Sequence, residues 1–286
     1  MENATPNTDP TPWWGSFSLS EETGGRWEVG PSTLWLYRTA REWRLLHHPS
    51  ADPVTADSLT DRSGATVPLP EVDMEPVLED PDDDLQVTRH SFRRTEPRVA
   101  LEPALADRLV VSRPEHPLHV PPGESVTLYL STAVWIRITL PDSGRQLQEV
   151  PSFRMSDTWF GDTTVDGEFC YATRTAGRLC LDHLPRRFHR AVIPLHIKNK
   201  AKDGLALERV QLPAPYLALY TTPNGQLWTQ DVTITRMEGR EGAGVDIRDG
   251  PPADIDAAEQ VQDPRETNRK GLFTSTFSAV GALFGS

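Results

Sequence analysis

Short stretches in which apolar and polar residues alternate run through the middle of the chain. In residues 126–131, VTLYLS, the apolar Val, Leu and Leu alternate with Thr, Tyr and Ser, and residues 135–140, WIRITL, alternate in the same way. A period of two places successive side chains on opposite faces of a β-strand. Such stretches are typical of antiparallel strands that bury one face.

Similar short stretches recur at a spacing of roughly ten residues. They predict further strands at residues 85–92, 107–112, 168–173, 190–197, 206–212, 215–221 and 226–236. Residues 34–37 (LWLY) and 43–46 (WRLL) flank a polar TARE segment and predict a hairpin. The Asn-Gly pair at 224–225 predicts a type I′ turn, because both residue types tolerate positive φ.

Helical periodicity is missing from most of the sequence. No stretch between residues 13 and 240 keeps an apolar period of 3.6 residues over three turns. Proline is frequent, at 26 of 286 residues, which disfavours long helices. The sequence therefore predicts an all-β fold of one or two antiparallel β-sandwiches, with a disordered N-terminal arm and a short C-terminal amphipathic helix.

The domain organisation follows from length and from shifts in polarity. At about 150 residues per domain, 286 residues favour two β domains. The expected segments are a disordered arm (1–12), an N-terminal β domain (13–112), a C-terminal β-sandwich (113–248), a polar linker (249–270) preceded by an edge strand near 245–247, and a tail helix (271–286). One continuous fold carrying a long insertion is the alternative.

Charge is distributed unevenly along the chain. There are 41 acidic and 29 basic residues, a formal net charge of −12. Residues 49–84 are predicted to form a loop, and its part from 71 to 84 carries eight carboxylates and no basic residue, so it does not suit a core strand. The excess of negative charge disfavours binding to nucleic acid backbones.

The N-terminal sequence and the cysteine content bear on the compartment. The first fifteen residues lack the cationic and apolar regions of a secretory signal, and the apolar runs are too short to cross a bilayer. We therefore expect a cytoplasmic protein in which Cys170 and Cys180 are thiols. A hairpin of residues 168–173 with 178–182 would instead place the two cysteines opposite each other, within reach of a disulfide.

Aromatic and acidic residues concentrate in residues 156–171, SDTWFGDTTVDGEFCY. Aromatic rings beside carboxylates can line a pocket for a cation or a sugar, or hold an acid–base pair. The simpler interpretation, which we favour, is a loop whose aromatic residues cap the sandwich and whose aspartates bond backbone amides. The candidate ligand-binding residues are Asp157, Trp159, Phe160, Asp162 and Glu168.

Two further clusters carry reactive or charged side chains. Cys170, Cys180 and His183 are zinc-ligand types, but their spacing matches no compact zinc module. Three arginines at 186, 187 and 190 suit a phosphate or carboxylate, although pairing with residues 71–84 or simple solvation is the expectation we favour. No phosphate-binding loop, nucleophile elbow or metalloprotease motif is present. The sequence therefore assigns no catalytic residue, metal ligand or cofactor, and leans away from an enzyme.

The C-terminal residues 271–286 repeat apolar side chains at helical spacing. Phe273, Phe277, Val280 and Phe284 fall at i, i+4, i+7 and i+11 and form one stripe of a helix. Such a helix suits docking into a groove of a partner protein or lying in a membrane interface. Folding back onto an apolar patch of its own sandwich is the third alternative.

The order of several segments resembles a known prokaryotic family. The segments are VPPGESVTLYLSTAVWIRI, SDTWFGD, GEFCYATRT, RAVIPLHIKN, LERVQLPAPYLALY and LWTQDVTI. Together they resemble the family called domain of unknown function 432, over roughly residues 13–250. The resemblance implies no established activity, cofactor or catalytic residue. The resemblance also implies an accessory or sensing role, because some relatives are fused to channel-like membrane segments. The lack of a membrane span in this sequence argues against a channel role.

The functional expectation combines these observations. We expect a non-catalytic β-sandwich interaction module that docks a protein partner through a sandwich face or through residues 271–286. The alternative is a small-ligand-binding protein or enzyme with a site around Trp159 and the neighbouring carboxylates.

Overall fold

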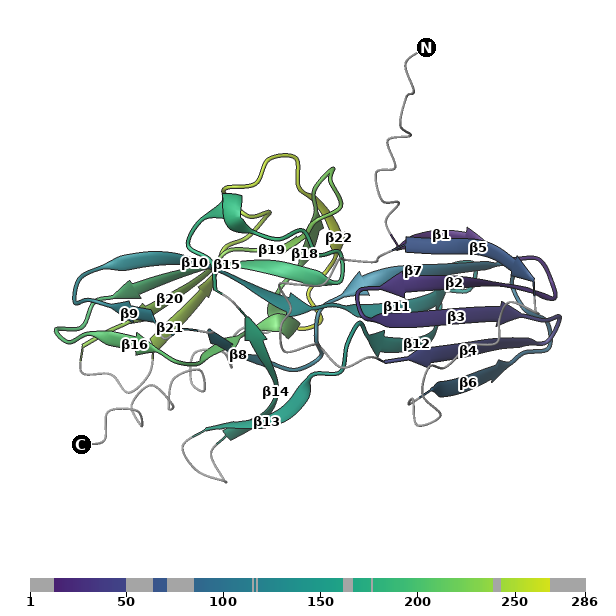
Figure 1. Ribbon diagram of the computed structural model, residues 1–286, viewed down its shortest axis with the longest axis horizontal. Coiled ribbons are helices and arrows are strands. Elements are labelled where there is room, and N and C mark those ends of the chain that lie inside the picture. The colour runs from purple at the N-terminus through teal and green to yellow at the C-terminus, as the bar shows by residue number, and fades with distance from the viewer. Residues whose placement is uncertain are drawn as a thin grey trace, which may run out of the picture. The chain divides into compact units, whose positions relative to one another are not determined.

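The structure, a computed structural model, describes residues 13–49, 64–70, 85–114, 116, 118–161, 167–175, 177–238 and 243–267 (Figure 1). These residues form many β-strands and two single-turn 3-10 helices, η2 (Leu181–His183) and η3 (Ala214–Tyr216). The all-β fold predicted from the alternating pattern is thus confirmed. Within the described ranges no helix has the length and apolar character needed to span a bilayer.

The described residues form two compact units, and each is presented by itself. The first contains residues from 13–49, 64–70, 85–102 and 136–153, and the second contains residues from 103–135 and 154–267. The first unit therefore takes strands from both sides of residue 112. Whether these units fold as the two separate domains expected from the sequence stays a prediction.

The first unit is a β-sandwich of two sheets. Its four-stranded sheet has the order β1-β7-β11-β12, and its five-stranded sheet has the order β5-β2-β3-β4-β6. The strands are β1 (Gly15–Ser18), β2 (Thr23–Val29), β3 (Ser32–Arg38), β4 (Glu42–His48), β5 (Gly64–Pro70), β6 (Gln86–Ser91), β7 (Arg98–Ala104), β11 (Trp135–Leu140) and β12 (Arg145–Pro151). Phe17 on β1 and Trp27 on β2 stack edge to face at 5.2 Å, so the two sheets share one core.

The predicted hairpin of residues 34–37 with 43–46 is confirmed as β3 and β4. The strands pair antiparallel, with Trp35 opposite Leu46 and Leu36 opposite Leu45. In β4, Trp43, Leu45 and His47 are buried and alternate with half-buried residues. A local turn joins the two strands, which is why the sequence alone located this pair.

Strand β5 corrects the prediction that residues 49–84 form one loop. Its backbone pairs antiparallel with β2, from Thr23 opposite Pro70 to Glu28 opposite Gly64. Strand β5 contains Pro68 and Pro70, and prolines disfavour a strand in the middle of a sheet. Because β5 is an edge strand of its sheet, a proline is tolerated where its nitrogen faces away from the ladder.

The second unit contains a seven-stranded sheet, a four-stranded sheet and a two-stranded sheet. The first has the order β21-β20-β15-β19-β18-β22, with β10 on the other edge of β15; the others are β13-β14-β8-β17 and β16-β9. The strands are β8 (Val110–Pro114), β9 (Leu118–Val120), β10 (Ser125–Ala133), β13 (Ser156–Gly161), β14 (Gly167–Thr175), β15 (Arg190–Asn199), β16 (Leu205–Leu207), β17 (Val210–Leu212), β18 (Leu219–Thr221), β19 (Leu227–Thr229), β20 (Val232–Arg236), β21 (Ala243–Ile247) and β22 (Glu259–Gln262).

Strand β15 is the centre of the large sheet. It pairs antiparallel with β10 over nine residues, from Ser125 opposite Lys198 to Ala133 opposite Arg190. Its other edge pairs parallel with β19 and then with β20. The strand predicted at 226–236 is therefore present, but it is interrupted at residues 230–231. These parallel pairs make the sheet mixed rather than purely antiparallel.

The loop between β18 and β19 is not the predicted type I′ turn. Gly225 has φ of 79°, whereas Asn224 is not among the described non-glycine residues with positive φ. The nitrogen of Gly225 donates to the carbonyl of Thr222 at 2.8 Å. Pro223 explains the difference, because its ring fixes φ near −65° and starts an ordinary turn that leaves the left-handed position to Gly225.

The predicted linker 249–270 is wrong for the part that the structure describes. Strand β22 pairs antiparallel with β18, and Ile255 and Ala258 pack on the buried cluster around Trp228. The segment looked like a linker because most of its residues are polar, proline or alanine. The predicted arm 1–12, the acidic residues 71–84 and the tail helix 271–286 lie outside the described residues.

Candidate functional site

The most distinctive surface of the second unit is the hairpin of β13 and β14. Its pairs include Trp159 opposite Phe169, Asp157 opposite Tyr171, and Phe160 opposite Glu168. Directly opposite residues share one face of a sheet, and successive residues alternate between faces. Trp159, Phe169, Asp157 and Tyr171 therefore lie on one face, and Phe160 and Glu168 on the other.

Phe160 belongs to the core. It forms a buried cluster with Val111 and Cys170, against which Leu109 packs. The side-chain amide of Gln211 donates to the sulfur of Cys170 at 3.6 Å, and burial raises the pKa of this thiol. This face of the hairpin is therefore structural.

The opposite face carries two large apolar side chains in solvent. Trp159 is 45% exposed and Phe169 is 51% exposed. The guanidinium of Arg108 lies 4.8 Å from the ring centre of Phe169 and 5.2 Å from that of Tyr171, and it donates to Asp157 at 3.3 Å. We call these five residues, Asp157, Trp159, Phe169, Tyr171 and Arg108, the aromatic platform.

Tyr171 anchors the platform to the body of the second unit. Its hydroxyl donates to Asp107 at 3.0 Å, and its ring lies 5.3 Å from the ring of Trp135. Burial, and then the hydrogen bond to Asp107, raise the pKa of Tyr171 to about 12. The phenol therefore stays protonated and able to donate at neutral pH.

Gly167 leaves room for the indole of Trp159. A Cβ atom at this glycine would lie 2.5 Å from Nε1 of Trp159 and 2.8 Å from the carbonyl oxygen of Phe160. Both distances are shorter than atoms tolerate, so the contact requires glycine. The indole is thus seated against the neighbouring strand, rather than free on a loop.

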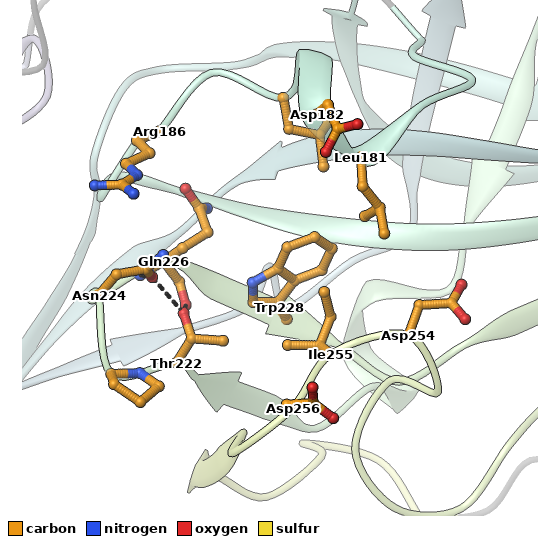
Figure 2. Close-up of a pocket in the computed structure, with 12 residues that line it drawn as sticks. Leu181, Asp182, Arg186, Thr222, Asn224, Gln226, Trp228, Asp254, Ile255 and Asp256 are labelled. Atoms are coloured by element: carbon orange, nitrogen blue, oxygen red, sulfur yellow. Dashed lines mark hydrogen bonds between the residues drawn. The ribbon is translucent and has the colours of Figure 1, made fainter.

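A separate pocket of about 430 Å³ opens in the same unit around Trp228 (Figure 2). Apolar side chains of Trp228, Leu181, Leu184 and Ile255 line it together with polar residues from three loops. Its rim carries three aspartates and one arginine: Asp182, Asp254, Asp256 and Arg186.

The family model for proteins of unknown function, DUF432, matches residues 13–281. The chain belongs to the DUF432 family. The match confirms the resemblance seen in the sequence and extends it to residue 281, so that it includes the hairpin, the pocket and most of the tail. No curated protein and no solved structure is significantly similar to the DUF432 chain.

The predicted ligand-binding residues of the DUF432 chain do not converge. Asp157 and Trp159 share the aromatic platform, Phe160 is buried on the other face, and Glu168 is exposed on that other face. Asp162 lies outside the described residues. The two described carboxylates thus lie on opposite sides of the hairpin, which is not an arrangement for an acid–base pair.

Three members of the platform, Phe169, Tyr171 and Arg108, were not predicted from the sequence. Phe169 and Tyr171 alternate in GEFCY just as Trp159 and Asp157 do in SDTWF, and pairing the two stretches as one hairpin would have found them. Arg108 carried no signal, because it lies 49 residues away from Asp157 in sequence.

The two cysteines of the DUF432 chain do not form a disulfide or a shared site. Both are free thiols, Cys170 buried and Cys180 exposed. The alternative hairpin of 168–173 with 178–182 is not formed: Cys170 stands opposite Thr158, because β14 pairs with β13 and β8. In the described residues, no three histidine, cysteine or acidic side chains are grouped so that they could hold a metal ion.

The predicted cluster of three arginines is split. Arg190 is 2% exposed, and its guanidinium donates to the hydroxyl of Ser131 at 2.9 Å and to the carbonyl of Ser131 at 3.1 Å. Arg186 instead lines the pocket around Trp228. The expected pairing with residues 71–84 concerns residues outside the described part.

Proposed function

We propose that this DUF432 protein is a non-catalytic interaction module that docks a protein partner on the aromatic platform. The observation that carries the proposal is the exposed cross-strand pair of Trp159 and Phe169 on β13 and β14. Isolated exposed apolar residues need no explanation, but two adjacent aromatic side chains that are about half exposed keep a large apolar area in water.

The composition of the platform favours a protein partner. Aromatic residues and arginine are enriched in the buried centres of protein interfaces and supply most of their binding energy. Arg108 and Asp157 neutralise each other, so the platform offers an apolar surface without net charge. We therefore propose an extended, apolar segment of another protein as the partner.

The position of β13 supports the same partner. It is the edge strand of its four-stranded sheet, so one side of its backbone is open for pairing within the described residues. An extended segment can add to such an edge through main-chain hydrogen bonds, while its side chains contact alternate residues of the edge strand. Trp159 would then contact the side chains of the added strand.

The platform is also pre-organised. Trp159 is seated against Gly167, and Phe169 and Tyr171 are covered by the same guanidinium. Side chains that are already fixed lose little conformational freedom on binding, which favours affinity.

The tail at 271–286 is a second proposed docking element, supported by the stripe of Phe273, Phe277, Val280 and Phe284. Arg265 donates to the carbonyl of Leu105 at 2.8 Å, and the nitrogen of Glu266 donates to the carbonyl of Pro215 at 2.9 Å. A truncation that tests the tail should therefore end after residue 270. We also propose a cytoplasmic location, which the two free thiols support.

The test is capture of partners from a lysate of the native organism with four purified proteins. These are the wild type, the double variant Trp159→Ser with Phe169→Ser, the variant Val87→Ala, and residues 1–270. Val87 is a matched control because it is exposed on β6, an edge strand of the first unit. We expect the double variant to lose at least about nine-tenths of a captured protein that Val87→Ala retains.

Retention of that protein by the double variant and its loss from residues 1–270 would assign docking to the tail. Retention by all the variants would contradict both docking proposals. Light scattering over a concentration series separates a second copy of the chain from a different partner.

A further inference from the structure

The pocket around Trp228 is separate from the aromatic platform, so the proposed docking function does not account for it. Its floor is the buried Trp228, which belongs to a core cluster with Tyr129, Val192, Ala218 and Tyr220. Leu181, Leu184 and Ile255 pack around this cluster and line the pocket. An aromatic floor with apolar sides is typical of sites for small molecules, and a volume of about 430 Å³ is within their usual range.

Hydrogen bonds fix one side of the pocket, the turn at residues 222–226. Asn224 Oδ1 accepts from the hydroxyl of Thr222 at 2.5 Å and from the nitrogen of Gln226 at 3.1 Å. The buried side chain of Gln226 accepts from the nitrogen of Arg187 at 3.0 Å and donates to the carbonyl of Arg190 at 3.3 Å. This wall is therefore pre-formed.

The opposite side, residues 254–256, is held by two buried groups. Oδ2 of Asp231 accepts from the nitrogen of Ala253 at 3.1 Å. The hydroxyl of Tyr129 donates to Asp254 at 3.2 Å. Ala257, directly after this wall, has φ of 54°, a left-handed conformation that is uncommon for alanine. This wall is therefore held by contacts between residues that are distant in sequence, rather than by the conformational preferences of its own residues.

The charge on the rim is negative. Asp182, Asp254 and Asp256 outnumber the single Arg186, which leaves two negative charges at neutral pH. Asp182 and Asp256 pair with no cation in the part of the chain that the structure describes. Figure 2 shows Arg186 beside the 222–226 turn and Asp254 across Trp228 from it. A concave site with unbalanced carboxylates attracts cations and repels anions.

We propose that this pocket binds a small organic cation, an amine with an apolar body. The apolar part would lie on Trp228 between Leu181 and Ile255, and the ammonium group would be held by Asp254 and Asp256. An ammonium group gains from an aromatic face as well as from carboxylates. A bare metal ion is a poorer match, since the described residues contain no suitable ligand group of three.

Calorimetric titration of the full chain with 1,5-diaminopentane tests this proposal. The uncharged 1,5-pentanediol has nearly the same shape, and glucose represents a polyhydroxyl ligand. We expect the diamine to bind with a Kd of about 1 mM or below at low salt, and the diol and glucose to bind at least tenfold more weakly. Added salt should weaken binding of the diamine.

Two variants locate the bound amine. Asp256→Asn should weaken binding of the diamine by about fivefold or more. Asp246→Asn is the matched control: Asp246 is exposed on β21 of the same unit and carries the same charge, so the change there should stay within about twofold. Both residues are exposed, so neither variant should unfold the protein, and thermal unfolding checks this.

Four results would overturn the proposal. They are no binding of the diamine up to about 10 mM, equal binding of the diol, tighter binding of glucose, or the same loss for Asp246→Asn as for Asp256→Asn. Because the platform variants leave the pocket intact, failure here and failure of the docking proposal are independent.

Discussion

The indole of Trp159 lies so close to Gly167 that a Cβ atom there would come within 2.5 Å of Nε1. The contact crosses from one strand of the hairpin to the other and seats the most exposed tryptophan of the second unit. Because Trp159 is central to the proposed docking surface, the absence of a side chain at Gly167 is needed for the position of the indole and so for docking.

Replacing Gly167 by alanine should displace the indole. The new methyl group would also press on the carbonyl of Phe160, which cannot move without disturbing the pairing of β13. We expect a loss of about 1–3 kcal/mol in the free energy of unfolding, measured in urea, together with weaker partner capture. Gly204→Ala is the control, because a Cβ there meets nothing within 4 Å. Equal stability of the two variants would contradict the contact.

Arg190 should be among the most sensitive residues of the second unit. Its buried guanidinium donates to Ser131 on β10 and to the hydroxyl of Thr173 on β14, and so connects the seven-stranded and four-stranded sheets. We expect Arg190→Met to lower the free energy of unfolding by about 2–4 kcal/mol. Arg174→Met, on an exposed position of β14, should change it by less than about 0.5 kcal/mol. An equally small effect of Arg190→Met would show that this connection between the two sheets does not stabilise the protein.

The two thiols should react at very different rates. Cys180 is exposed, whereas Cys170 is buried and its pKa is raised by that burial. The thiolate is the reactive form, so a thiol reagent at pH 8 should modify one cysteine rapidly and the second only after unfolding. Cys180→Ser should abolish the fast reaction. Two fast thiols would contradict the burial of Cys170.

Glu42 gives the stability of the first unit a dependence on acid pH. It accepts hydrogen bonds from Arg89 at 2.8 Å and 2.5 Å, and this pairing lowers the pKa of Glu42 below its usual 4.5. A lowered folded pKa means that the contribution is complete above the unfolded pKa and is lost as the pH falls through the folded one.

Measuring unfolding at several pH values checks this contribution. Arg89 is 63% exposed, so solvent screening limits the effect of Glu42→Gln to about 0.5–1 kcal/mol at pH 7. The difference from the wild type should shrink as the pH falls below 4.5. Glu102→Gln, an exposed position on β7, is the matched control and should change the free energy of unfolding at pH 7 by less than about 0.5 kcal/mol. A difference that grows as the pH falls would contradict a lowered pKa of Glu42 in the folded protein.

Local patterns were enough to predict some elements. The pairing of β3 with β4 joins stretches that a short polar turn separates, and the long strands β10 and β15 stand out by alternation alone. Two of the five platform residues, Asp157 and Trp159, were predicted for a similar reason, because they stand in one short stretch rich in aromatic and acidic residues.

Other features depend on contacts that no local pattern records. The parallel pairing of β15 with β19 and β20 needs the surrounding fold. Tyr129 and Asp254, which build one wall of the pocket, are 125 residues apart. Strand β5 was missed because its prolines are acceptable only at a sheet edge, and the edge is known only once the sheet is assembled.

Hydrogen exchange of the protein with and without a captured partner tests the central proposal most directly. If an extended segment adds to the edge of β13, backbone amides in residues 156–161 should exchange at least about tenfold more slowly in the complex, while those of β6 stay unchanged. Unchanged exchange in β13, with protection elsewhere, would show that the aromatic platform is not the docking surface.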